Sequence, residues 1–348
     1  MRIGIVGAGW WAGYAHLPAF QAAGAQVSGV YSRTPAHARE LAARFGLRAY
    51  PSYQELLQDC EAVAISTTDD THAPLGLQAL AAGKHLFMEK PLARTLAEAE
   101  AIVQAAQQHR RIGLTALTSR GDLAAETAQQ IVRSGEIGEV LYLRGHFHGG
   151  FMGDPEGPTP WRAKAETGGA GGALADLGAH LFDLVRMVTG LEFTQVMAQA
   201  HIHFRRADPV TNFDEGALLA RLGEASGAFS LSRVHVGQDQ QLKLEIQGSK
   251  GALLLSPALW GQGKSYRLLL ARRPGQFLEV APDPSLLRGR NPESPWGYFQ
   301  FVELARRFLQ GVRTGQQPEP SLEDGLAAQK VIEAVVQSAQ NGGWVAIR

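Results

Sequence analysis

The first 116 residues alternate between short apolar runs and segments with helical spacing, and this alternation constrains the fold more than any other feature. Strands that alternate with helices form a parallel sheet with helices on both faces. We therefore expect residues 1–120 to form an α/β domain with a doubly wound parallel sheet. The expected strands are 2–6, 26–31, 62–66, 84–88 and 111–116, and the expected helices reach about residue 23 and cover 35–45, 73–82 and 95–108.

The pattern changes after residue 120. Strand-like runs then follow one another without regular helices between them, which is typical of an antiparallel sheet. We expect residues 121–348 to form an α+β domain with a large, mainly antiparallel open sheet, whose C-terminal segment is able to pack back on the first domain. Its expected strands are 140–148, 196–204, 216–222, 228–234, 242–247, 252–255, 266–270 and 344–347, and its expected helices are 122–134, 174–189, 296–312 and 322–341.

Composition excludes several classes of protein. Thirty-three basic residues balance thirty-three acidic ones, and no basic run argues for a nucleic-acid partner. Cys60 is the single cysteine, so the chain can form neither an intrachain disulfide nor a zinc–cysteine cluster, which fits a reducing cytoplasm. The N-terminus resembles neither a signal peptide nor a membrane span, so we expect a cytoplasmic protein with no membrane partner.

A glycine turn follows the first expected strand and opens a helix. Gly7 allows the tight turn, Gly9 lets the backbone approach a pyrophosphate, and Ala12 lets helix and strand pack closely. The N-terminus of the following helix favours phosphate. The sequence therefore predicts dinucleotide binding here, with Trp10 and Trp11 of the turn in the cofactor site. A purely structural turn is the alternative.

The end of the second strand bears on the choice between NAD and NADP. An acidic residue is expected there to bind a free ribose 2′-hydroxyl, but this chain has Tyr31-Ser32-Arg33. Ser32 can donate to a 2′-phosphate, and Arg33 can pair with it. NADP is therefore favoured over NAD as the cofactor. The alternative is that Arg33 is a solvated residue at a helix start.

Two later strand ends add further candidates. Thr67, Thr68 and His72 follow the strand that ends near residue 66, where short polar side chains can line a dinucleotide or cap the next helix. Glu89 and Lys90 stand before Pro91, which ends the following strand because proline cannot donate to a sheet ladder. Lys90 thus belongs to the edge where open parallel sheets bind ligands.

A second group of titratable residues lies in the expected helix 174–189. Asp176 and His180 are four residues apart and would share one helix face, with Asp183 next to them. Histidine accepts protons near neutral pH, and a carboxylate can orient it. The alternative is a structural pair. No further ligands stand at recognisable spacing, so we expect no metal.

With these residues together, the chain resembles the Gfo/Idh/MocA family of NAD(P)-dependent oxidoreductases, named for glucose-fructose oxidoreductase and inositol dehydrogenase. The motifs that carry the resemblance run in the family's order from end to end: the glycine turn, Glu89-Lys90-Pro91, residues 134–138, Trp161-Arg162 before the glycine-rich 168–172, and Asp176-x-Gly178-x-His180.

The resemblance implies a Rossmann domain followed by an α+β domain for substrate binding and oligomerisation, whose open sheet often mediates homodimers or homotetramers. It implies that Lys90 lies beside the nicotinamide ribose and hydrogen-bonds the reacting oxygen. His180 would be the acid/base, and Asp176 would position the substrate or His180. These three residues are the expected catalytic set.

The expected substrate-binding residues are Lys90, Arg120, Trp161, Arg162, Asp176 and His180. Many members have an arginine, an aromatic residue and a proline where this chain keeps only Arg120. The proline and asparagine that often follow the fourth strand are replaced by Thr68-Asp69-Asp70. His146 and His148 could contact a sugar or lie on the surface at alternate strand positions.

The resulting prediction is an NAD(P)-dependent dehydrogenase or reductase that transfers a hydride between nicotinamide and a hydroxyl or carbonyl carbon of a sugar, polyol or related small molecule. One alternative is a glycosidase of the same fold that holds NAD and regenerates it within one cycle. Another is a non-enzymatic dinucleotide sensor, against which the retention of Lys90, Asp176 and His180 argues.

Overall fold

The computed structural model describes residues 1–237, 240–256, 266–290 and 297–348, and the chain divides into two compact units. The first unit contains residues 1–118 and 298–326, and the second contains residues 119–297 and 327–348. From the sequence, the expected boundary lies after residue 120, and a C-terminal segment is expected to be able to pack back on the first domain.

The first unit is built on a six-stranded parallel sheet of order β3-β2-β1-β4-β5-β6, as expected from the alternation of strands and helices. This order reverses at β1 and β4, which is the switch point where doubly wound sheets bind ligands. The strands are β1 (Arg2–Val6), β2 (Gln26–Tyr31), β3 (Arg48–Ala49), β4 (Ala62–Ile65), β5 (His85–Met88) and β6 (Gly113–Thr115).

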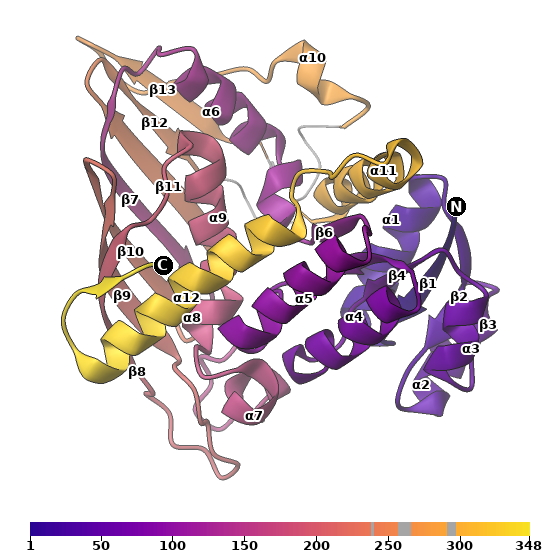
Figure 1. Ribbon diagram of the computed structural model, residues 1–348. Coiled ribbons are helices and arrows are strands. Elements are labelled where there is room, and N and C mark those ends of the chain that lie inside the picture. Colours follow the sequence, from indigo (N-terminus) through magenta and orange to yellow (C-terminus); the bar gives the residue numbers. More distant parts are fainter. Residues whose placement is uncertain (238–239, 257–265, 291–296) are drawn as a thin grey trace. The chain divides into compact units, whose positions relative to one another are not determined.

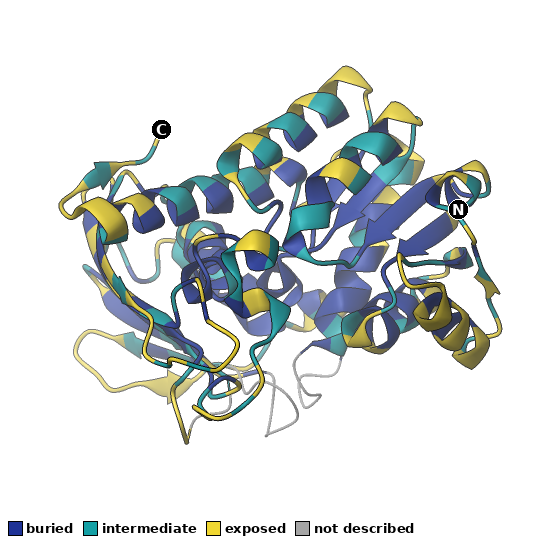
Figure 2. Cartoon of the chain, turned by 90° about the horizontal axis from the view of Figure 1, so that it is seen from below, coloured by how far each residue is buried: buried dark blue, intermediate teal, exposed yellow. Residues whose placement is uncertain are grey.

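Helices cover both faces of this sheet, so the central strand β4 is buried throughout and β1 is buried from Ile3 to Val6 (Figures 1 and 2). One face packs against α1, α2 and α11, and the other against α3, α4 and α5. The glycine turn continues into a π-helical turn, Ala12–His16, before α1. The helices are α1 (Leu17–Ala22), α2 (Pro35–Arg44), α3 (Tyr53–Gln58), α4 (His72–Ala81), α5 (Leu96–Gln108) and α11 (Tyr298–Thr314). Trp296, where the last of these was expected to begin, lies outside the described residues.

The second unit contains a nine-stranded sheet of order β14-β13-β12-β11-β7-β10-β9-β8-β15. It is mainly antiparallel, as expected, but β7 and β10 pair in parallel, with Ser226 opposite Tyr142 and Ser232 opposite His148. The strands are β7 (Val140–His148), β8 (Gln195–His201), β9 (Glu215–Leu222), β10 (Ala225–Ser232), β11 (Gln241–Gly248), β12 (Gly251–Leu255), β13 (Leu268–Arg272), β14 (Leu278–Glu279) and β15 (Val345–Ala346).

Helices of the second unit pack on one face of its sheet (Figure 1). Alternate residues of the strands, such as Leu143 and Phe147 of β7, point into this core, and the residues between them point to the opposite face. The helices are α6 (Leu123–Arg133), α7 (Ala165–Gly168), α8 (Ala173–Asp176), α9 (Gly178–Thr189), α10 (Pro284–Leu287) and α12 (Leu322–Asn341), whose first residues belong to the first unit. None of the described helices combines the length and apolar character needed to cross a membrane.

Candidate active site

The glycine turn after β1 leaves its backbone open on one side. Gly7 has φ +108° and donates its N–H to the carbonyl of Tyr31 at 2.8 Å, and an added Cβ would stand 2.0 Å from the carbonyl oxygen of Ser66. At Gly9 the space is open: apart from Gly9 and its two chain neighbours, no atom of the described residues lies within 4 Å of the place where its Cβ would be. Ala12 is fully buried. A phosphate group can therefore approach the backbone at Gly9, and the residues present fit a dinucleotide.

The end of β2 carries no carboxylate. The strand stops at Tyr31, Ser32 is half-buried, and Arg33 is exposed. The Ser32 hydroxyl accepts a hydrogen bond from the N–H of Thr34 at 3.3 Å, which leaves its own proton available for a ligand. The preference for NADP that these residues suggest stays a prediction.

The segment after β4 is held to the segment after β5 by a buried histidine. The ring nitrogens of His72 lie 3.0 Å from the carbonyl oxygen of Pro91 and 3.3 Å from that of Thr67. Burial lowers the pKa of His72, so the ring is neutral near pH 7 and donates to one carbonyl at a time. His72 has no exposed surface, and its two ring nitrogens face these two carbonyls. Its contact with a cofactor stays a prediction.

Three threonines accompany His72. The Thr71 hydroxyl donates to that of Thr67 at 2.8 Å. The Thr68 hydroxyl is buried and has no hydrogen-bond partner among the described residues. Thr67 and Thr68 are half-buried at the carboxyl end of β4, where a ligand of the sheet would lie.

Glu89 joins the glycine turn and the π-helical turn after it to the backbone of Lys90. Its Oε1 accepts hydrogen bonds from Nε1 of Trp11 at 2.7 Å and Nε2 of His16 at 2.8 Å, and its Oε2 accepts from the N–H of Lys90 at 3.2 Å. Burial alone would raise the pKa of Glu89, but its contacts with His16, Lys90 and Trp11 outweigh burial, so this pKa lies below its usual value. The carboxylate therefore stays ionised and fixes the backbone of Lys90, which is itself half-buried.

His16 was not among the residues that sequence analysis selected. It lies in the π-helical turn, is fully buried, and meets Glu89 73 residues later in the chain. No local pattern connects two residues at that separation.

In the second unit, the expected helix 174–189 is divided. The helix α8 ends at Asp176 and α9 begins at Gly178, so Asp176 and His180 belong to successive helices and not to one. The break lies next to Gly178, and glycine disfavours helix. A Cβ added at this position would lie 2.7 Å from the ring of Phe182. Leu177 between the two helices keeps nearly helical angles, φ −90° and ψ −35°. His180 is 7% exposed.

Trp161 and Arg162 lie close to Asp176. The Arg162 guanidinium stacks over the Trp161 ring at 4.3 Å, and its Nε is 3.8 Å from Oδ1 of Asp176. This distance is an ion pair without hydrogen-bond geometry. The arginine is nearly half-exposed, so it can move toward a ligand. The structure thus brings together three residues that the sequence placed in the substrate set.

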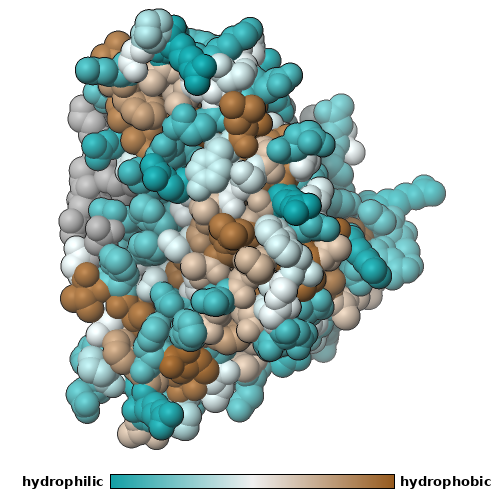
Figure 3. Space-filling view, turned by 90° about the vertical axis from the view of Figure 1, so that its left-hand side faces the viewer, coloured by the Kyte–Doolittle hydropathy of each residue, from teal (hydrophilic) through white to brown (hydrophobic). Residues whose placement is uncertain are grey.

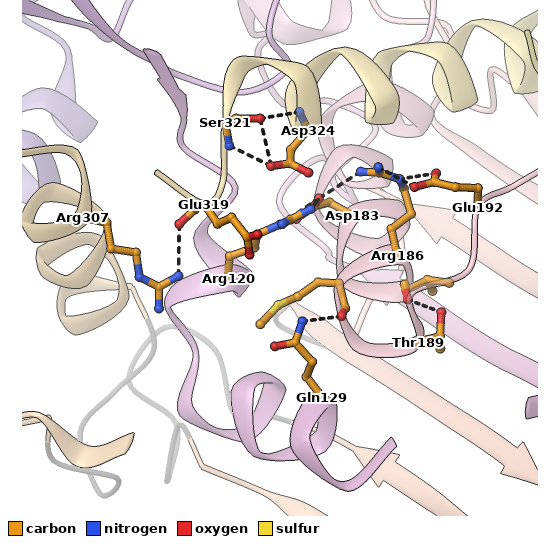
Figure 4. A network of polar contacts seen from close by, with 12 residues as sticks. Arg120, Gln129, Asp183, Arg186, Thr189, Glu192, Arg307, Glu319, Ser321 and Asp324 are labelled. Atoms are coloured by element: carbon orange, nitrogen blue, oxygen red, sulfur yellow. Dashed lines mark hydrogen bonds and ion pairs between the residues drawn. The ribbon is translucent and has the colours of Figure 1, made fainter. Parts of the chain in front are cut away.

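Arg120 has a buried acidic partner. Its Nε and Nη2 donate to Asp183 at 2.9 and 2.7 Å, and Nη1 of Arg186 lies 3.5 Å from Oδ1 of the same carboxylate (Figure 4). Arg186 in turn donates to Glu192 at 2.6 and 2.8 Å. This network fixes α9 to the segment before α6. Contact of Arg120 with a substrate stays a prediction.

Two histidines of β7 lie on the sheet face opposite the helices. The rings of His146 and His148 stack at 4.5 Å, and that of His235 stacks on His148 at 4.6 Å. They occupy the alternate strand positions that sequence analysis considered for surface residues. Within the described residues, no group of three or more His, Cys, Asp or Glu side chains is arranged to hold a metal ion.

Comparison with known families accounts for most of the chain. A family described as "Oxidoreductase family, NAD-binding Rossmann fold" matches residues 1–116, and the "GFO/IDH/MocA C-terminal domain" matches residues 125–254. Levoglucosan dehydrogenase of Pseudarthrobacter phenanthrenivorans is 26% identical over 99% of this chain and 97% of its own length. Myo-inositol 2-dehydrogenase of Thermotoga maritima is 26% identical over 83% of this chain and 81% of its own length.

Solved structures agree with these relatives. Levoglucosan dehydrogenase in complex with NADH and levoglucosan has a TM-score of 0.91 at 26% identity, covering 100% of this chain and 99% of that one. An inositol dehydrogenase homolog from Azotobacter vinelandii with NAD+ has a TM-score of 0.88 at 23% identity, which shows the shared fold.

Proposed function

We propose a sugar or polyol substrate for this chain, which belongs to the Gfo/Idh/MocA family of NAD-binding oxidoreductases. The chain is an NAD(P)-dependent dehydrogenase or reductase acting on CH–OH groups. The proposed substrate class rests on relatives that are named for levoglucosan, glucose 6-phosphate and myo-inositol. The observation that carries the proposal is the presence in one chain of the open glycine turn, Lys90, and the Asp176 and His180 pair.

The proposed cofactor residues lie at the carboxyl edge of the parallel sheet. Gly7, Gly9 and the turn with Trp10 and Trp11 would hold the pyrophosphate, and Thr67 and Thr68 would line the dinucleotide. When bound, the nicotinamide supplies the acceptor or donor of the hydride. We propose that NADP is preferred, because Ser32 and Arg33 can bind a 2′-phosphate and no acid stands at the end of β2.

The proposed catalytic roles follow from the chemistry of three side chains. His180 would take the hydroxyl proton during oxidation or return it during reduction, because imidazole exchanges protons near neutral pH. Lys90 would donate a hydrogen bond to the reacting oxygen and stabilise charge that develops there. Asp176, with Arg162 3.8 Å away, would bind and orient the substrate.

A screen of sugars and polyols with NAD and NADP tests the substrate class. On a substrate found in this way, His180→Ala should lower kcat about 10²–10⁴-fold. Lys90→Ala should lower kcat/KM about 10²–10³-fold. His37→Ala and Lys250→Ala, both at exposed positions, are the matched controls and should keep wild-type turnover. Near-wild-type rates in both Lys90→Ala and His180→Ala would overturn the roles given to these residues.

The same screen separates a glycosidase from a dehydrogenase. Release of free sugar from a glycoside without net change in NAD(P)H absorbance would favour the glycosidase. Stoichiometric formation of NAD(P)H together with an oxidised sugar would support the dehydrogenase.

The cofactor preference has its own test. Replacing Ser32 by Asp and Arg33 by Ala adds the missing carboxylate and removes the cation, so the kcat/KM ratio should shift toward NAD. A wild-type enzyme that already prefers NAD would contradict the preference.

We further propose a homodimer or homotetramer that assembles through the open face of the second sheet. This face mixes apolar and polar side chains (Figure 3), and it includes Tyr142 and Leu219, which are 37% and 46% exposed. Leu219→Lys should reduce the mass measured by light scattering, whereas a mass equal to that of wild type would contradict this surface. The cytoplasm stays the proposed compartment because Cys60 is the single cysteine.

A further inference from the structure

Arg233 is a buried cation at a position where a neutral hydrogen-bond donor would be sufficient for the fold. It follows β10 by one residue and is completely buried. Its Nη1 donates to the carbonyl of Arg162 at 2.8 Å, and its Nη2 donates to Oδ1 of Asn212 and to the carbonyl of Phe213, both at 2.9 Å. Removing a guanidinium from water is costly, and neutral donors could satisfy the same three acceptors.

Asn212 also binds the backbone of this loop. Its Nδ2 donates to the carbonyl of Arg162 at 2.9 Å and to that of Gly169 at 2.8 Å. The carbonyl of Arg162 therefore accepts from two buried side chains at once. The loop continues to Gly172, whose φ is +53° and whose Cβ would stand 2.3 Å from the carbonyl oxygen of Phe213. The backbone of Arg162 and the residues leading to α8 are thus fixed on both sides.

Asp214 is a buried carboxylate close to the positive charge of Arg233. Its Oδ1 lies 3.9 Å from Nη2 of Arg233, and its Oδ2 accepts from the backbone N–H groups of His203 and Phe204. Burial lowers the pKa of Arg233, and the charges of Asp176 and Asp214 act in the opposite direction. Asp176 itself lies 3.8 Å from the guanidinium of Arg162, the residue whose carbonyl Arg233 and Asn212 bind.

We propose that Arg233 and Asn212 are positioning residues for substrate binding: they clamp the backbone of Arg162 so that its guanidinium stays beside Asp176. The substrate hydroxyls then meet a carboxylate that accepts hydrogen bonds and a guanidinium, held in place, that donates them. This inference rests on the proposed function for the identity of the ligand. The rigidity of the clamped loop can be measured without any substrate.

The first test follows hydrogen exchange of the Gly168 amide by NMR. This amide donates to the carbonyl of Lys164 at 2.8 Å within the clamped loop. Arg233→Gln replaces two donating nitrogens by one, so the exchange rate of Gly168 should rise about tenfold. An unchanged rate in a folded Arg233→Gln protein overturns the proposal, whether or not the chain oxidises sugars.

Arg206 is the matched control. It donates to the carbonyls of Met152, Asp154, Gly157 and Pro158, so it also fixes a loop of the second unit through several backbone acceptors. Arg206→Met should lower thermal stability but leave the exchange rate of Gly168 nearly unchanged. A rise as large as that in Arg233→Gln would mean that any loosening of these loops exposes this amide, and would overturn the specific role of Arg233.

Asn212→Ala tests the clamp independently and decides it if Arg233→Gln does not fold. It removes two hydrogen bonds to the loop without changing any charge, so KM for the substrate should rise about tenfold while kcat stays near its wild-type value. Unchanged KM in this variant overturns the clamp. If the wild type turns over no sugar or polyol, the proposed function fails, and the clamp is then decided by the exchange rates of the Gly168 and Gly169 amides. They should rise in Asn212→Ala, and unchanged rates overturn it.

Discussion

Replacing Glu89 by leucine is the perturbation whose cost can be worked out most directly from the structure. Glu89 is 8% exposed, and its carboxylate accepts hydrogen bonds from Trp11, His16 and the backbone N–H of Lys90. A buried donor left without an acceptor costs about 1–3 kcal/mol. Breaking a buried pair by removing one partner costs about 3–5 kcal/mol in total, part of which the added apolar contact offsets. We expect Glu89→Leu to lower the free energy of unfolding by about 3 kcal/mol.

Urea unfolding measures this change. With a slope of about 3 kcal/mol per molar urea, the midpoint should fall by about 1 M. Glu100→Gln is the control, because Glu100 is exposed on α5, and its effect should stay within about 0.5 kcal/mol.

A double-mutant cycle with His16→Phe isolates the contact itself. The His16 ring already lies 5.7 Å from that of Phe87 and 4.6 Å from that of Phe301, so a phenyl ring is compatible with its surroundings. The double variant should be more stable than the sum of the single changes predicts, by about 1–2 kcal/mol. A Glu89→Leu protein within about 1 kcal/mol of wild type, or single effects that add, would refute the reasoning.

Three further predictions concern the first unit. The stability gap between wild type and Glu89→Leu should shrink in urea titrations as the pH falls below about 4.3, because a carboxyl with a lowered folded-state pKa contributes fully above its unfolded pKa and loses this contribution as the pH falls through the folded-state pKa. Gly7→Ala should lower the free energy of unfolding by more than the about 1–2 kcal/mol that a positive φ costs an alanine, and should weaken dinucleotide binding in calorimetry. Gly24→Ala, with φ +83° and open space around the added Cβ, should lower it only by the cost of the positive φ. Thr95→Ala removes the capping box of α5 and should cost about 1 kcal/mol by urea unfolding.

Elements bounded by local signals were predictable from the sequence. The strands 26–31 and 140–148 and the helix 322–341 have the expected limits, because each is a run of consistent periodicity. The helix α3 was missed because its six residues are too few for a clear period. The parallel pairing of β7 with β10 could not be predicted, because strand order depends on contacts between residues far apart in the sequence.

The residues of the candidate site also differ in how far the sequence could predict them. Gly7, Gly9, Lys90 and His180 belong to compact motifs, and sequence analysis selected them. Arg233 reaches Arg162 across 71 residues, and Asn212 reaches it across 50. Such supporting residues carry no motif of their own, and only the folded chain identifies them.

The interleaving of the two units along the chain has a consequence for synthesis on the ribosome. The apolar face formed by residues such as Phe20 and Phe87 is completed by Phe301, Leu304 and Phe308 of α11. While the ribosome translates residues 119–297, the emerging parallel sheet must keep that face uncovered or shielded by a chaperone. A nascent chain arrested before α11 should therefore be cleaved by protease within residues 1–118, and one arrested after residue 326 has left the exit tunnel should resist cleavage there.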